Sequence, residues 1–161
     1  MANEMTHIID TERPWFDIAI AYERMGVMEI PGREAHPMIL AFHRHTSLGA
    51  KSDEVPWCSA FVCACMEHAG IKSTHSAAAR SWLTWGQPIM TPKVGCVVVL
   101  DRSDPANPNA AHVGLFWAHR ADDRIDILGG NQRNRVCVAP YPKAKVLAYR
   151  WPTLDLLQDH A

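Results

Sequence analysis

Hydrophobic positions in the first half of the chain recur at helical spacing. In segment 14–25, apolar residues stand at 15, 18, 19, 22 and 25, and Gly26 follows. Apolar residues three and four apart line one face of a helix, and a glycine commonly ends one. Segments 37–49, 57–70 and 77–86 have related patterns, and 57–70 is the most apolar. The pattern predicts several short helices, with 57–70 buried.

After Pro92 the chain changes to short runs rich in β-branched and aromatic residues. Turn-forming or polar residues separate five of them: GCVVVLD, HVGLFWAH, RIDILGG, RVCVAPY and KVLAYRWP. Runs this short at this spacing predict an antiparallel sheet. Helices first and strands later indicate an α+β domain rather than alternating α/β units.

Size and composition indicate one globular domain. The chain has 161 residues, of which 48% are hydrophobic and 20% charged, a composition too apolar for disorder. We expect an arm over 1–13, a single domain over 14–152 and a tail over 153–161. We also expect a monomer.

Charge and hydropathy exclude several classes of protein. A net charge of −1 argues against a nucleic-acid binder. No apolar run approaches the roughly 20 residues of a membrane-spanning helix, so no membrane insertion is expected. The acidic start MANEMTHIIDTERPW lacks the pattern of a signal peptide. We therefore expect synthesis in the cytoplasm.

One of the five cysteines differs from the others. Four of them, at 63, 65, 96 and 137, fall inside predicted helices or strands and are typical of small core residues. Cys58 follows Pro56-Trp57 at the start of the predicted helix 57–70. Backbone N–H groups at a helix start favour an anion, so we expect a lowered thiol pKa and a reactive nucleophile at Cys58.

A metal or other cofactor is not predicted. The cysteines form no CxxC pair, and the His43-x-His45 pair has no third ligand at useful spacing.

His112 is the histidine best placed to act as a base for a thiol. It opens a predicted strand directly after the polar loop 102–111. A cysteine nucleophile needs such a base within hydrogen-bond reach. A third residue would hold the imidazole ring in one orientation. Asn131 is the first candidate for this role, and Gln132 and Asp126 are alternatives.

Seven segments together resemble the CHAP domain, a family of cysteine, histidine-dependent amidohydrolases and peptidases related to the NlpC type. They are GVMEIPG, VPWCSAFVCACMEHAGI, ARSWLTWG, VGCVVVL, AHVGLFW, LGGNQ and YRWP. The resemblance implies a papain-like fold with N-terminal helices packed on a five- to six-stranded antiparallel sheet. It implies cleavage of peptidoglycan amide bonds, with Cys58 as nucleophile, His112 as base and Asn131 as orienting residue.

We expect four residues to contact the peptidoglycan substrate: Trp57, Ser59, Asn109 and Gln132. Many relatives carry a Glu two residues before the Asn, where this chain has Gly129.

The resemblance fits a phage endolysin that reaches the periplasmic cell wall with a holin. Alternatives are a secreted antibacterial effector, paired with an immunity protein, and an inactive peptidoglycan-binding module.

Overall fold

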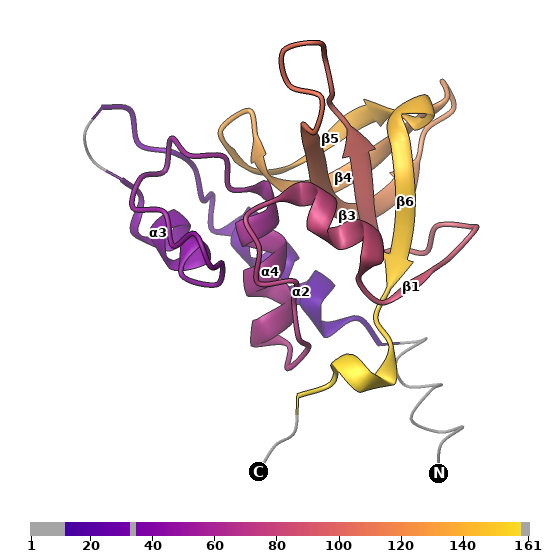
Figure 1. Ribbon diagram of the computed structural model, residues 1–161, viewed down its shortest axis with the longest axis horizontal. Helices are drawn as coiled ribbons and strands as arrows, with labels where there is room; N and C mark the ends of the chain where they lie inside the picture. Colours follow the sequence, from indigo (N-terminus) through magenta and orange to yellow (C-terminus); the bar gives the residue numbers. More distant parts are fainter. Residues whose placement is uncertain (1–11, 33–34, 159–161) are drawn as a thin grey trace.

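A computed structural model of the chain describes residues 12–32 and 35–158. A layer of helices packs beside an antiparallel sheet (Figure 1). The α-helices are α2 (Pro14–Arg24), α3 (Pro37–His43) and α4 (Cys58–His68). The 3-10 helices are η1 (Ala79–Thr84), η2 (Lys143–Lys145) and η3 (Leu154–Leu156). The strands are β1 (Gln87–Pro88), β2 (Val97–Asp101), β3 (Ala111–His119), β4 (Arg124–Gln132), β5 (Arg135–Pro142) and β6 (Val146–Trp151).

The sheet has six strands in the order β1-β6-β2-β3-β4-β5, and all neighbours are antiparallel. This confirms the predicted α+β fold, including a five- to six-stranded antiparallel sheet. The five apolar runs each form one strand. The sixth strand, β1, is only two residues long, which is too short for an alternating pattern to reveal.

Two predicted helices are shorter or tighter than expected. The helix expected over 37–49 ends at His43, because the next backbone N–H groups bond three rather than four residues back. There the carbonyl of His43 also accepts a hydrogen bond from the Thr46 hydroxyl at 3.0 Å. The helix expected over 77–86 is the 3-10 helix η1. Its Ser81 hydroxyl bonds the Ala78 carbonyl at 2.7 Å, an alternative to regular α-helical bonding.

Helix α4 forms the centre of the core. Every residue from Cys58 to Met66 is buried, as expected for a helix that is apolar on all sides. It contacts α2 and α3 as well as β3 and β4, and Figure 1 shows it between α3 and the sheet. The first residue of α4 is therefore held against the strands that carry His112 and Gln132.

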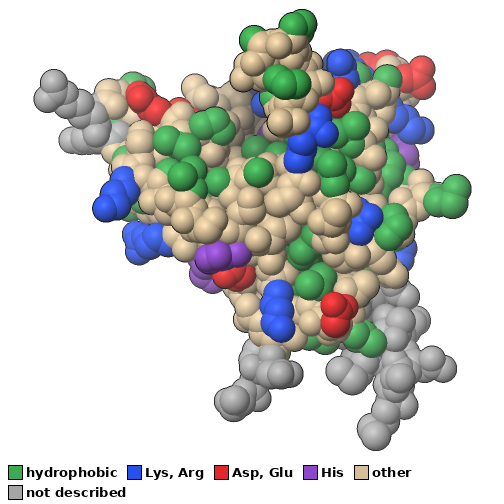
Figure 2. Space-filling model, in the orientation of Figure 1, with side chains coloured by type: hydrophobic (Ala, Val, Ile, Leu, Met, Phe, Trp, Pro, Cys, Tyr) green, Lys and Arg blue, Asp and Glu red, His purple; other side chains and the backbone are tan. Residues whose placement is uncertain are grey.

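The predicted domain boundaries stay predictions. Most of the predicted arm, residues 1–11, lies outside the described residues. In the predicted tail, the backbone pairs with the segment that follows α4, since Lys72 N–H bonds the Leu156 carbonyl at 2.7 Å. Across the described ranges, no helix has both the length and the apolar character that a bilayer crossing requires. Figure 2 shows acidic and basic side chains interspersed on one face, in keeping with the small net charge.

Candidate functional site

Cys58 is the first residue of α4, as the sequence predicts. Burial raises the pKa of its thiol, and this effect outweighs four opposing ones. The backbone N–H groups of Val113 and of the helix start, together with the Arg102 cation, lower the pKa. The expectation of a lowered thiol pKa is therefore wrong in direction, because the helix start lies inside the protein rather than at its surface. The resting side chain is a neutral thiol.

The backbone N–H of Val113, which acts on the Cys58 thiol, links this residue to His112, because His112 and Val113 are consecutive on β3. The His112 side chain is fully buried. Its Nε2 lies 2.9 Å from Oε1 of Gln132 and 3.3 Å from the hydroxyl of Tyr141. The Tyr141 ring stacks on the imidazole, with centroids 5.2 Å apart and planes 23° apart. The other ring nitrogen, Nδ1, has no hydrogen-bond partner among the described residues.

Gln132 determines which nitrogen of His112 carries the proton. Its amide Nε2 donates to the carbonyls of Ile127 at 3.1 Å and Cys137 at 2.7 Å. An amide nitrogen only donates, so these two acceptors turn the Gln132 oxygen toward the imidazole. That oxygen only accepts, so His112 Nε2 must donate to it and carry the hydrogen. The free Nδ1 then holds a lone pair and can act as a base.

The pKa of His112 favours the same role. Burial lowers it, the Arg102 cation lowers it further, and the Gln132 hydrogen bond raises it, so that it falls from 6.5 to about 4. The imidazole is therefore neutral at neutral pH. A neutral imidazole with a free Nδ1 can accept the proton of the neutral Cys58 thiol as the sulfur attacks a substrate.

Of the three candidate orienting residues, the structure brings only Gln132 to His112. Asn131 is half-buried, and its side chain makes no hydrogen bond to His112 in the part of the chain that the structure describes. Its φ of +58° belongs to an irregularity in the β4–β5 pairing between Gly129 and Gln132. Asp126 lies further back on β4 and pairs with Arg120 at 3.3 Å. The orienting role of Asn131 stays a prediction that these contacts do not favour.

Gly129 explains how Gln132 reaches the ring. A Cβ at position 129 would stand 3.5 Å from His112 Nε2 and only 2.5 Å from Oε1 of Gln132. A side chain at 129 would thus occupy the space that the Gln132 amide fills. The signal for this contact in the sequence is Gly129, which stands where many relatives carry an acid and leaves room for the neighbouring amide.

Trp57 and Ser59 do not line the surface, so their contact with the substrate stays a prediction that their burial does not favour. Both are completely buried. The indole N–H of Trp57 donates to the Glu29 carboxylate at 2.9 Å. The hydroxyl of Ser59 donates to the Ser76 carbonyl at 2.6 Å and accepts from the Trp82 indole at 2.9 Å. These bonds hold the chain on both sides of Cys58.

A close approach of backbone completes this packing. A Cβ at Gly130 of β4 would stand 2.6 Å from the Trp57 ring and 2.8 Å from Cβ of Phe61. Only glycine therefore lets the start of α4 lie this near β4.

Asn109 belongs to the loop over residues 102–110, which joins β2 to β3 and projects beyond the strand ends in Figure 1. Its side chain is exposed, and its carbonyl accepts a hydrogen bond from Arg80 Nε at 2.9 Å. The side chain is thus accessible, and its contact with substrate stays a prediction.

Sequence reasoning missed two residues beside the candidate base. The Arg102 guanidinium lies over the Tyr141 ring, 5.9 Å from its centroid, and that ring stacks on His112. Burial raises the pKa of Tyr141 to about 12, so its hydroxyl stays protonated. No local pattern in the sequence marks either residue, because they come from separate segments.

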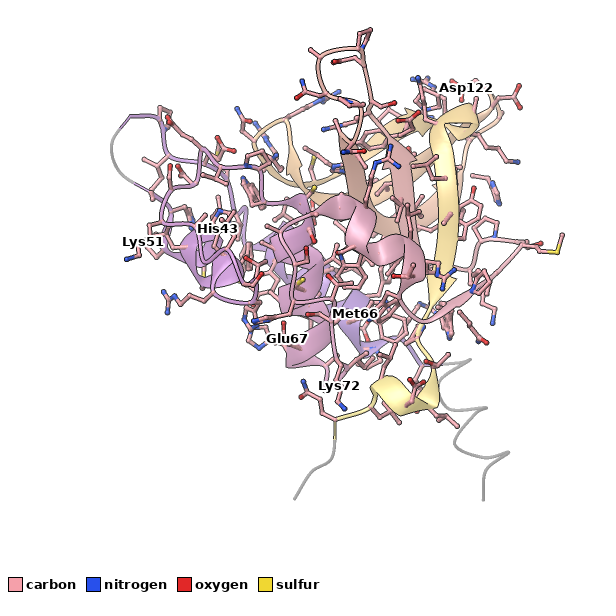
Figure 3. The ribbon with its side chains drawn as sticks, in the orientation of Figure 1. His43, Lys51, Met66, Glu67, Lys72 and Asp122 are labelled. Carbon is pink, nitrogen blue, oxygen red and sulfur yellow. The ribbon has the colours of Figure 1, made fainter. Side chains whose placement is uncertain are left out.

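The described residues contain no group of three or more His, Cys, Asp or Glu side chains arranged to hold a metal ion. His43 has two ring nitrogens without a hydrogen-bond partner among these residues. It lies among the helices, away from the sheet (Figure 3).

Comparison with protein families matches residues 50–131 to the CHAP domain. The matched range includes both Cys58 and His112 and ends one residue before Gln132. A search of curated proteins found no match.

Proposed function

Since the chain belongs to the CHAP domain family, a family of amidase- and peptidase-type cysteine hydrolases, we propose that it hydrolyses an amide bond of bacterial peptidoglycan. The observation that carries this proposal is the state of His112. Gln132 holds its Nε2 as a donor, and the buried Nδ1 is left as an unpartnered base on the strand beside the Cys58 thiol.

The proposed reaction has two stages. As substrate binds, His112 Nδ1 takes the thiol proton and the Cys58 sulfur forms a bond to the amide carbon. The backbone N–H groups at the start of α4 can stabilise the resulting oxyanion. When the C–N bond breaks, the imidazolium gives its proton to the leaving amine. A water molecule, deprotonated by His112, then attacks the thioester, and the products are a carboxylic acid, an amine and the regenerated thiol.

In this mechanism Gln132 takes the orienting role that the resemblance assigned to Asn131. It accepts the Nε2 hydrogen of His112 in every stage, so the imidazolium formed during attack is stabilised without a change of tautomer.

Mass analysis of digested peptidoglycan tests the proposal directly. Purified protein is incubated with cell-wall sacculi, and the released fragments are compared with those from the Cys58→Ala variant. New amino and carboxyl termini identify the bond, which separates an amidase from an endopeptidase. A folded wild-type protein that releases no fragments, or a Cys58→Ala protein that releases the same ones, would contradict the proposal.

For the cellular role, we propose a phage endolysin that a holin delivers to the periplasmic cell wall. A secreted antibacterial effector with an immunity partner is the alternative. Expression of the chain in the bacterial cytoplasm with and without a holin separates the two, because an endolysin lyses the cell only when the holin is present. Lysis that instead requires export by a secretion system would favour the effector.

One observation favours a second candidate function, an inactive module that binds peptidoglycan. Burial raises the pKa of the Cys58 thiol, which slows any reaction that depends on the thiolate. Alkylation with iodoacetamide decides between the two. A hydrolase should show His112-dependent labelling of Cys58, whereas labelling of a binding module should not depend on His112.

A further inference from the structure

An arginine without a carboxylate partner among the described residues lies near the candidate site. Arg102 is exposed, and no described Asp or Glu lies within salt-bridge distance of it. Its guanidinium lies over Tyr141, which stacks on the imidazole of His112. The cation also acts electrostatically on both Cys58 and His112, which places it close to the two reacting groups.

The position of Arg102 follows from the sheet. Leu100 of β2 is paired with His112 of β3, and the Arg102 N–H continues the ladder by bonding the Ala110 carbonyl at 3.0 Å. Side chains two residues apart on a strand share a face, so Arg102 projects on the same side as His112. The backbone at the base of the 102–110 loop thus fixes where the guanidinium emerges.

The carboxylates nearest in sequence are already engaged. Asp101 pairs with Arg80 at 3.5 Å and accepts the Ser103 N–H at 2.8 Å. Asp104 accepts the N–H groups of Ala106 and Asn107, both at 2.8 Å, and so closes its own turn. The charge of Arg102 is therefore left uncompensated beside the site.

We infer that Arg102 binds a carboxylate of the peptide substrate next to the amide bond that Cys58 attacks. This inference rests on the proposed function and makes the preferred substrate an anionic peptide stem. The guanidinium carbon of Arg102 lies 5.9 Å from the centroid of the Tyr141 ring, and the N–H groups of a guanidinium lie in its plane. Those in-plane donors match the two oxygens of a carboxylate.

The test compares two substrates that differ in one group. Peptidoglycan stem fragments are prepared with either a free carboxylate or a carboxamide next to the cleaved bond, and kcat/KM is measured for each. The wild-type protein should prefer the carboxylate by about tenfold or more. Arg102→Gln should remove this preference, chiefly by raising KM for the carboxylate substrate. Because each variant is compared with itself, any change in thiol reactivity cancels from the ratio.

Two further variants make the comparison specific. Arg102→Lys keeps the charge but loses the planar pair of donors, so it should retain only part of the preference. Arg120→Gln is the matched control for charge. Arg120 follows the end of β3 opposite to His112 and pairs with Asp122, which Figure 3 shows at the periphery. This control should keep the full wild-type preference.

A binding measurement keeps the inference testable without turnover. Calorimetry on the Cys58→Ala protein and on the Cys58→Ala, Arg102→Gln double variant compares affinity for the same two fragments. If Arg102→Gln removes the preference for the carboxylate fragment in this binding measurement, the inference is supported. If the wild-type protein hydrolyses neither fragment, only the proposed function is overturned. Hydrolysis by wild type with the same ratio in Arg102→Gln would overturn the inference and leave the proposed function standing.

Discussion

Acidification should destabilise the fold through His112 well before most carboxylates are protonated. The pKa of this histidine is about 4 in the folded protein, against 6.5 when it is unperturbed. Between these values the unfolded chain binds a proton that the folded chain does not, so unfolding takes up a proton and stability falls with falling pH. The contribution is fully present above pH 6.5 and is lost as the pH falls toward 4.

The size of the effect follows from the two pKa values. The pKa shift of His112 corresponds to a loss of about 3 kcal/mol in the free energy of unfolding in the limit of low pH, and about 2 kcal/mol of this is lost by pH 5. Urea unfolding at pH 7.5, 6 and 5 measures it, with His112→Gln as the comparison. This variant starts from a lower stability but should lose about 2 kcal/mol less than wild type on acidification to pH 5.

The comparison removes contributions from other groups. Burial also lowers the pKa of His43, but that residue titrates in both proteins and its effect cancels from the difference. Wild type and His112→Gln with parallel stability profiles would refute the reasoning. An NMR titration in which the His112 ring protonates near pH 6.5 would refute it as well.

The other predictions concern activity. Cys58→Ala should abolish peptidoglycan hydrolysis and change the unfolding free energy by only about 1 kcal/mol, which thermal melts and sacculus digestion check together. Gln132→Glu should lower kcat by about a hundredfold or more, because a carboxylate oxygen would then face two backbone carbonyls. Asn131→Ala should keep most of the activity. The opposite ranking of the two variants would return the orienting role to Asn131. EDTA should leave hydrolysis unchanged, and a loss restored by zinc or calcium would contradict this. Replacing residues 103–109 by a Gly-Ser link should weaken turnover far more than thermal stability, so equal digestion rates would indicate a passive loop.

The elements that the sequence predicts well are those with a long apolar run. Helix α4 begins at Cys58 as predicted, because a proline and a tryptophan precede a long apolar run. The strands follow from their β-branched runs. By contrast, the end of α3 depends on a hydroxyl, that of Thr46, which competes for a backbone carbonyl. Periodicity carries no information about such a competition.

The candidate site was predictable in its position but not in its electrostatics. Cys58 and His112 each occupy a recognisable place, the start of a helix and the start of a strand. The direction of the thiol pKa shift depends on how deeply the surrounding layers bury that helix start. The contact of Gln132 with His112 depends on an irregular turn of the backbone at Asn131. Both are properties of packed layers, which a single sequence does not display.

The shared space between positions 129 and 132 makes these two residues interdependent. A glutamate introduced at Gly129 would collide with the Gln132 amide, and a small residue introduced at Gln132 would leave His112 Nε2 without an acceptor. Each single exchange should therefore impair the site, whereas the double exchange offers the ring an acid in place of the amide. Converting the Gly129–Gln132 pair into an acid at 129 with a small residue at 132, one substitution at a time, therefore passes through an impaired protein. Both positions have to be exchanged together to convert one arrangement into the other.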